Sequence, residues 1–197
     1  MAFGGHGAVR ILLAMFAAAG LGTVTANGQT APDQSTVVVR MDNLAGVLSA
    51  DLRFAEGRAA AVFRRIGVDI EWVDEDEAVR RRIGAPLTIV LVNGEKNAGR
   101  AAQFVDALGL ADRTIRRAHI FYDRVAELNA GTPRTVSSLL GDVIAHELGH
   151  LLLVPPGHSA DGIMRPALET KSWSLRTFTQ AQAREIRSRL DNAAPVR

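Results

Sequence analysis

The feature that most constrains the fold of this chain is a short run with two histidines and a glutamate inside an otherwise apolar segment. The run reads HELGH at residues 146–150. Around it, apolar residues recur every three or four positions, which is typical of an α-helix with a buried face. Pro155-Pro156 must end this helix, because proline lacks the amide hydrogen and its ring clashes with the preceding turn. The helix is predicted to begin at Thr132 or nearer to Ser137.

The two histidines of this run are four residues apart, so on a helix they project from the same face. That spacing lets two imidazoles reach one zinc ion at about 2.0–2.1 Å. Glu147 lies beside them and is free to hold a zinc-bound water and take its proton. A carboxylate and two histidines would be costly to bury without a partner, and a metal supplies one. We therefore predict a zinc site with His146 and His150 as ligands and Glu147 as general base.

Residues 146–166 read HELGHLLLVPPGHSADGIMRP. This segment resembles the active site of metzincin zinc peptidases, and the serine after its third histidine resembles the matrixin branch. The resemblance implies that His158 is the third zinc ligand and that Met164 is the Met-turn methionine beneath the metal. It also implies a zincin-like fold, in which a short antiparallel edge strand, here at 107–111, borders the cleft and binds the substrate backbone.

Two positions depart from the family pattern. Seven residues instead of five separate His150 from His158, and Leu153 stands where the family has glycine. The chain reversal would then fall on Pro155-Pro156-Gly157, since proline fixes φ and glycine tolerates a positive φ.

The third ligand has two alternatives, both carboxylates. Glu169 lies nineteen residues beyond His150, close to the spacing of thermolysin-like enzymes, and Asp161 lies in the loop itself.

The N-terminal residues predict an exported protein. Arg10 precedes an apolar run from Ile11 to Ala19, and small residues follow near Ala26, which is typical of a signal peptide over residues 1–28. Residues 29–197 are then predicted to form one metzincin-like catalytic domain. The chain has no cysteine, so disulfides are excluded. We expect a secreted or periplasmic protein without stable membrane association after signal cleavage.

The remaining pattern predicts an α/β or α+β fold, with a mixed twisted sheet, two long helices and a C-terminal helix that opens at Thr179. Residues 87–92 form the most continuous apolar run of strand length and should be central in the sheet. A helix is expected over 48–66, with Leu48 at the start of its inner face. The acidic run at 74–77 and the arginines at 80–82 indicate a solvated helical turn, with a calcium site as the alternative. Further strands are expected at the following residues: 36–40, 68–73 and 118–123.

The net charge of +2 is small, and no interleaving of basic and aromatic residues indicates nucleic-acid binding. The sequence therefore predicts an exported zinc-dependent endopeptidase that acts on peptides or proteins as a monomer. Two alternatives stay open. One is an exported zinc-binding module without turnover, whose site would be closed by a fourth ligand, and the other is an enzyme that hydrolyses a different amide or an ester.

Overall fold

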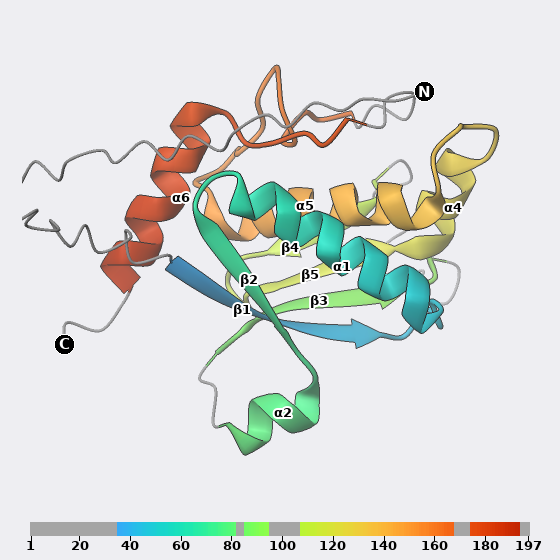
Figure 1. Cartoon of the computed structure of the whole chain (residues 1–197), viewed down its shortest axis with the longest axis horizontal. Coiled ribbons are helices and arrows are strands. Elements are labelled where there is room, and N and C mark those ends of the chain that lie inside the picture. The colour runs from blue at the N-terminus through green and yellow to red at the C-terminus, as the bar shows by residue number, and fades with distance from the viewer. Residues whose placement is uncertain (1–34, 82–84, 95–106, 168–173, 194–197) are drawn as a thin grey trace, which may run out of the picture. The chain divides into compact units, whose positions relative to one another are not determined.

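The computed structural model describes residues 35–81, 85–94, 107–167 and 174–193. These residues all belong to one compact unit, Pro32–Arg197. The predicted signal peptide lies outside the described residues, and so does Glu169. The described part has a mixed α/β fold (Figure 1). Its strands are β1 (Ser35–Asn43), β2 (Val68–Val73), β3 (Leu87–Val92), β4 (Gly109–Asp112) and β5 (Arg117–Phe121). Its helices are α1 (Ser49–Arg64), α2 (Glu75–Arg80), α4 (Tyr122–Asn129), α5 (Val136–Leu152) and α6 (Gln180–Ala193).

The five strands form one mixed sheet in the order β2-β1-β3-β5-β4. Strands β2, β1, β3 and β5 pair in parallel, whereas β4 pairs antiparallel with β5 and forms one edge. All six residues of β3 are buried at the centre of the sheet, as its continuous apolar run predicts. The short antiparallel edge strand expected at 107–111 is present as β4, at 109–112.

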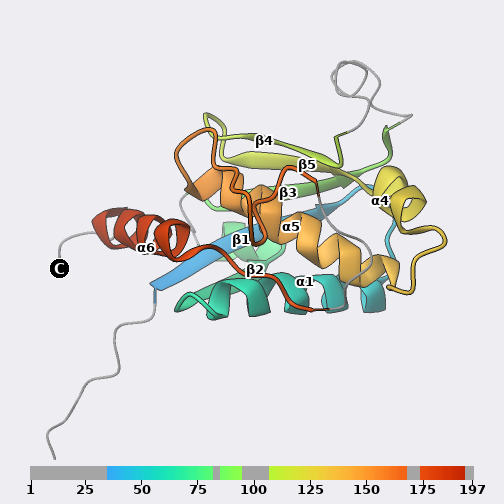
Figure 2. The same cartoon turned by 90° about the horizontal axis from the view of Figure 1, so that it is seen from above.

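Helices α1 and α5 lie side by side on one face of the sheet (Figures 1 and 2). They approach closely at Gly141, where a Cβ atom would lie only 2.8 Å from the backbone oxygen of Ala55. The interface beneath them is apolar and contains fully buried Phe63, Leu140 and Ile144. Close packing of these two helices therefore fixes the position of α5 relative to the core.

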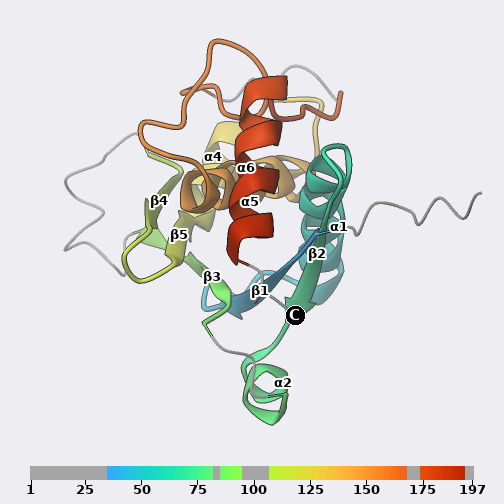
Figure 3. The same ribbon diagram turned by 90° about the vertical axis from the view of Figure 1, so that its left-hand side faces the viewer.

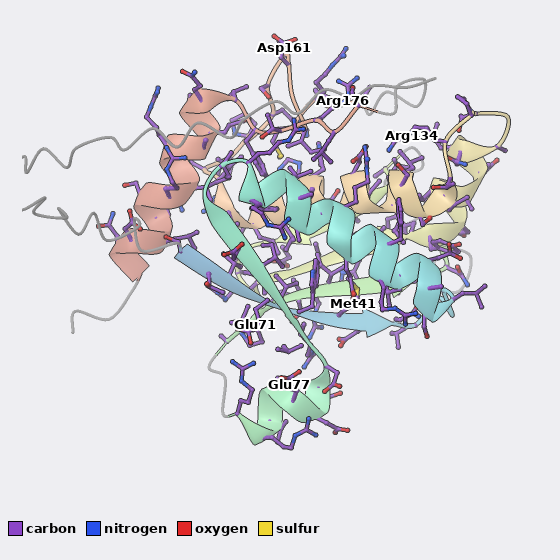
Figure 4. The ribbon with its side chains drawn as sticks, viewed as in Figure 1. Met41, Glu71, Glu77, Arg134, Asp161 and Arg176 are labelled. Atoms are coloured by element: carbon purple, nitrogen blue, oxygen red, sulfur yellow. The ribbon has the colours of Figure 1, made fainter. Side chains whose placement is uncertain are left out.

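A buried ion cluster joins the same two helices one turn before His146. Asp142 of α5 accepts hydrogen bonds from Nε of Arg58 at 2.7 Å and from Arg134 at 2.6 Å. The side chains of Arg134 and Asp142 are 1% and 2% exposed, so this pair is shielded from water. Arg134, which lies at the start of α5 (Figure 4), also bonds to Ser138. The cluster ties the first turns of α5 to α1.

Helix α5 begins at the second of its two predicted positions, near Ser137, and α1 begins one residue later than predicted. Thr135, not Thr132, caps α5, because its side chain accepts a hydrogen bond from the amide of Ser138. The helix ends at Leu152, before the two prolines, as predicted. Leu48 was expected on the inner face of α1, but it precedes the helix and is 71% exposed.

Helices α6 and α2 lie on either side of the sheet in Figure 3. Helix α6 contacts β1 and passes the C-terminal end of α5 (Figures 1 and 3). Helix α2 projects from the other side, where Arg81 pairs with Glu71 and Glu77 in the exposed charged turn that the sequence predicts (Figure 4). Among the described residues, no helix has the length and apolar character needed to cross a membrane.

Candidate metal centre

Three histidines from two different elements meet at one point. His146 and His150 project from α5, and His158 follows in the irregular segment after it. The Nε2 atoms of His146 and His150 lie 3.0 Å apart. The centroid of the His158 ring lies 5.4 Å from that of His146 and 4.7 Å from that of His150. One nitrogen from each ring falls within 4.8 Å of the others. In the part of the chain that the structure describes, no other group of three or more metal-binding side chains occurs, and the acidic run of α2 forms none.

The orientation of His146 leaves one ring nitrogen available. Its Nδ1 lies 2.9 Å from the backbone carbonyl of Ile163, which is an acceptor only, so Nδ1 carries the proton. Nε2 then presents its lone pair toward His150. Such a carbonyl partner is the usual support of a metal-ligating histidine, because it fixes both the tautomer and the ring plane.

The surroundings of His146 and His150 favour the neutral form of both rings. Burial lowers the pKa of His146. Burial and the two neighbouring histidines lower the pKa of His150 to about 4. A neutral imidazole is the form that binds a metal ion.

The three rings are spaced so that they could hold a single metal ion. Two nitrogens at about 2.0–2.1 Å from a tetrahedral zinc lie roughly 3.3 Å apart, close to the 3.0 Å between His146 and His150. Imidazole nitrogen is also the donor that transition-metal ions favour, whereas calcium and magnesium take oxygen. His158 is exposed, so the cluster opens to solvent on that side.

A tight turn at residues 159–164 follows His158 and contacts His146. Ile163 orients His146 through its carbonyl, and the carbonyl of Met164 accepts a hydrogen bond of 3.0 Å from the amide of Ser159. Met164 is fully buried, and its Sδ occupies the space beside Gly149 where a Cβ atom would collide with it. Glycine at position 149 therefore lets the turn pack directly against the helix that carries two of the histidines.

Glu147 points toward the edge strand. Its side chain is buried, and burial raises its pKa to about 8. Its carboxylate lies against Gly109 of β4, where a Cβ atom would come within 2.6 Å of Oε1. This contact could not be predicted from the sequence, because the two residues are far apart in the chain and Gly109 belongs to no motif. Only glycine leaves the carboxylate enough room at this point.

A cleft of about 940 Å³ runs past these groups. The residues that line it include the edge strand at 107–111, the three histidines, Glu147 and the segment 153–158. The cleft therefore has the edge of the sheet on one side and the irregular segment on the other, with the histidines between them.

The cluster is made by the three predicted histidines. Asp161, an alternative ligand by sequence, is exposed at the outer end of its loop and does not belong to the cluster (Figure 4). Its backbone carbonyl instead accepts a hydrogen bond from the hydroxyl of Ser159.

The reversal before His158 occurs where the sequence predicts it. Gly157 has a positive φ of 71°, and Pro155-Pro156 is a cis peptide. A Cβ atom at Gly157 would also lie 3.3 Å from Nδ1 of His150, so the chain passes close over that ring. Glycine therefore serves both the backbone conformation and the close approach.

Comparison with known proteins leaves the chain without an assigned family. No family model matches the sequence, and no curated protein matches it.

Proposed function

We propose that this protein is an exported, zinc-dependent endopeptidase of the metzincin type, with His146, His150 and His158 as the zinc ligands. One observation carries the proposal. Three imidazoles meet in a cleft, and the buried carboxylate of Glu147 lies beside them. A structural metal site does not require a carboxylate that is not a ligand, whereas hydrolysis of a peptide bond requires a proton acceptor next to the metal.

The chemistry divides between the metal and the chain. Zinc, when bound, lowers the pKa of a coordinated water to about 7 and polarises a carbonyl as a Lewis acid. Glu147 accepts the proton of the attacking water and later delivers it to the leaving nitrogen. Burial alone would keep Glu147 protonated, but a cation at the histidines favours the ionised form that this role needs.

The edge strand offers a place for the substrate backbone. The amide of Phe121 donates to the carbonyl of Leu108, and Gly109 is paired with Ile120 in the register of β4 and β5. Hydrogen-bonded and non-hydrogen-bonded pairs alternate in an antiparallel ladder, so the backbone groups of Gly109 and Ala111 point away from β5. They face the open edge beside Glu147. An extended peptide that pairs with this edge would pass directly in front of the proton acceptor.

The proposal is tested with the mature domain and a broad peptide mixture. We expect cleavage that a chelator abolishes and that stoichiometric zinc restores. Glu147→Gln should retain the metal and lose at least about 100-fold in rate, because general base catalysis contributes roughly 10²- to 10⁴-fold.

Each competing function gives a different result in the same assay. Metal binding without any cleavage would indicate a zinc-binding module. Cleavage of esters or other amides without cleavage of peptides would place the same centre in a different hydrolase. Unchanged turnover in Glu147→Gln would overturn the role of this glutamate.

A further inference from the structure

The segment that carries His158 lacks the supports that hold the other two histidines. Residues 153–158 form neither helix nor strand, and Val154, Pro155 and His158 are exposed. Only Leu153 anchors the segment in the core. An imidazole on such a segment would sample many positions unless other contacts fix the backbone on both sides of it.

Gln182 of α6 supplies those contacts. Its side-chain nitrogen donates to the carbonyl of Gly157 at 2.9 Å and to the hydroxyl of Ser159 at 3.1 Å. These two residues flank His158 in the sequence. The amide orientation follows from the partners, since a carbonyl can only accept and the side-chain oxygen of Gln182 faces the amide of Thr179 at 3.0 Å. A single buried side chain therefore holds the chain immediately before and after the third histidine.

Further hydrogen bonds complete the support. Glu185, one turn further along α6, accepts from the amide of Val154 at 2.6 Å, at the start of the segment. Ser159 is also held from the other side, because its amide donates to Met164 and its hydroxyl to Asp161. The backbone around His158 is thus bonded to α6 and to the turn at 159–164.

We propose that Gln182 is a positioning residue that sets how tightly the protein holds its metal ion, by fixing the backbone on both sides of His158. The inference rests on the proposed metal site. Gln182 does not line the cleft and forms no hydrogen bond with the three imidazoles, so its hydrogen bonds reach the site only through Gly157 and Ser159. In this way α6 compensates for the long connection between the second and third ligands.

The same residue also caps its own helix, and this second role needs a control. The hydroxyl of Thr179 accepts from the amide of Gln182, while the side chain of Gln182 accepts from the amide of Thr179. Thr179→Ala removes part of this capping box and leaves both hydrogen bonds to the His158 segment in place. Gln182→Met keeps a side chain of similar length and removes both the cap and the two donated bonds.

The experiment measures zinc affinity by competition with a chromophoric chelator, on the purified mature domain. We expect Gln182→Met to weaken zinc binding about 10- to 100-fold, the effect typical of residues that orient metal ligands. Ser159→Ala, which removes one of the two bonds, should weaken it by a few-fold. Thr179→Ala and the exposed Gln180→Ala should leave the affinity unchanged.

A double-mutant cycle with His158→Ala separates positioning of the ligand from general loosening of the fold. If Gln182 acts through His158, Gln182→Met should cause no further loss of affinity once that histidine is absent. The cobalt form gives a second readout, because its visible spectrum depends on the coordination geometry. We expect the spectrum of Gln182→Met to move toward that of His158→Ala.

Two results would overturn the inference. One is a wild-type affinity in Gln182→Met, and the other is an equal loss from Gln182→Met with and without His158. A wild-type protein that binds no zinc would remove the proposed function, and the inference with it. Zinc binding that is insensitive to Gln182 would remove the inference alone.

Discussion

The two parts of the candidate metal centre are built in different ways. His146 and His150 project from α5, a 17-residue helix that packs against α1 and strands β3, β4 and β5. His158 lies in an exposed irregular segment, and the side chain that holds its neighbours belongs to α6, 23 and 25 residues away in the sequence. The helical part is therefore fixed by burial of apolar surface, whereas the loop part depends on a few specific hydrogen bonds.

Substitutions in the two parts should therefore alter different properties of the protein. A change in the contacts of α5 removes interactions from the core, so it should mainly lower the free energy of unfolding. A change in the contacts around His158 removes solvent-adjacent hydrogen bonds, so it should mainly alter metal affinity. We expect the larger effects at α5, and a smaller one at the edge strand that its Glu147 contacts.

The largest effect is expected at the buried ion cluster. Asp142→Ala should lower the free energy of unfolding by about 3 to 5 kcal/mol, because it leaves the buried guanidinium of Arg134 without its counter-ion. Chemical denaturation of the chelator-treated protein measures this value. The matched control is Glu77→Ala, which breaks an exposed pair with Arg81 and should leave stability nearly unchanged. Similar effects of the two substitutions would contradict the buried role of Asp142.

The next effect concerns Glu147 in the metal-free protein. Burial raises the pKa of this carboxyl to about 8 in the folded state, against an ordinary value of 4.5. The folded protein therefore holds a proton that the unfolded chain releases, so this contribution to stability is present at acidic pH and is lost as the pH rises toward 8.

Comparison with Glu147→Gln isolates this contribution, since the histidines are common to both proteins. Each pKa unit is worth about 1.36 kcal/mol, so between about pH 5 and pH 8 the metal-free wild type should lose roughly 3 kcal/mol relative to Glu147→Gln. Denaturation curves of both proteins over this pH range provide the test. Parallel pH profiles would show that Glu147 is hydrated and not buried.

The smallest of the three effects is expected at the edge strand. Gly109→Ala places a methyl group within 2.6 Å of the Glu147 carboxylate and must displace it. We expect a loss of about 100-fold in the rate of peptide cleavage, the effect of a misplacement of about 1 Å, with zinc affinity unchanged. Gly57→Ala is the control, because a Cβ atom there meets no other atom, and it should stabilise α1 by about 0.5–1 kcal/mol. Full activity of Gly109→Ala would show that the position of the carboxylate is not critical.

The parts of the structure that depend on local pattern could be predicted from the sequence. The run at 87–92 was predicted as a central strand because only a strand covered on both faces is apolar throughout. The two histidines of α5 could be predicted to project from the same face, because residues four apart lie on one face of a helix. The reversal at Gly157 followed from the conformations open to proline and glycine.

Features that depend on distant contacts could not be predicted. The Thr179-x-x-Gln182 pattern is typical of a capping box, and the residues form one, but no local pattern indicates that the same amide also holds Gly157 and Ser159. The choice between the two predicted starts of α5 also depends on hydrogen bonds outside the helix. Thr132 bonds back to Asn129 and closes the preceding turn, which leaves Thr135 to cap the helix.

In the proposed zinc site, one helix and one loop bring three imidazoles to a single metal ion and leave a coordination position open. A crystal structure of the zinc-loaded protein, with the metal located by its anomalous scattering, tests it most directly. We expect His146, His150 and His158 at about 2.0–2.1 Å from one zinc ion, with at least one position filled by solvent. A site closed by a fourth protein ligand, or a His158 ring turned away from the zinc, would contradict the account.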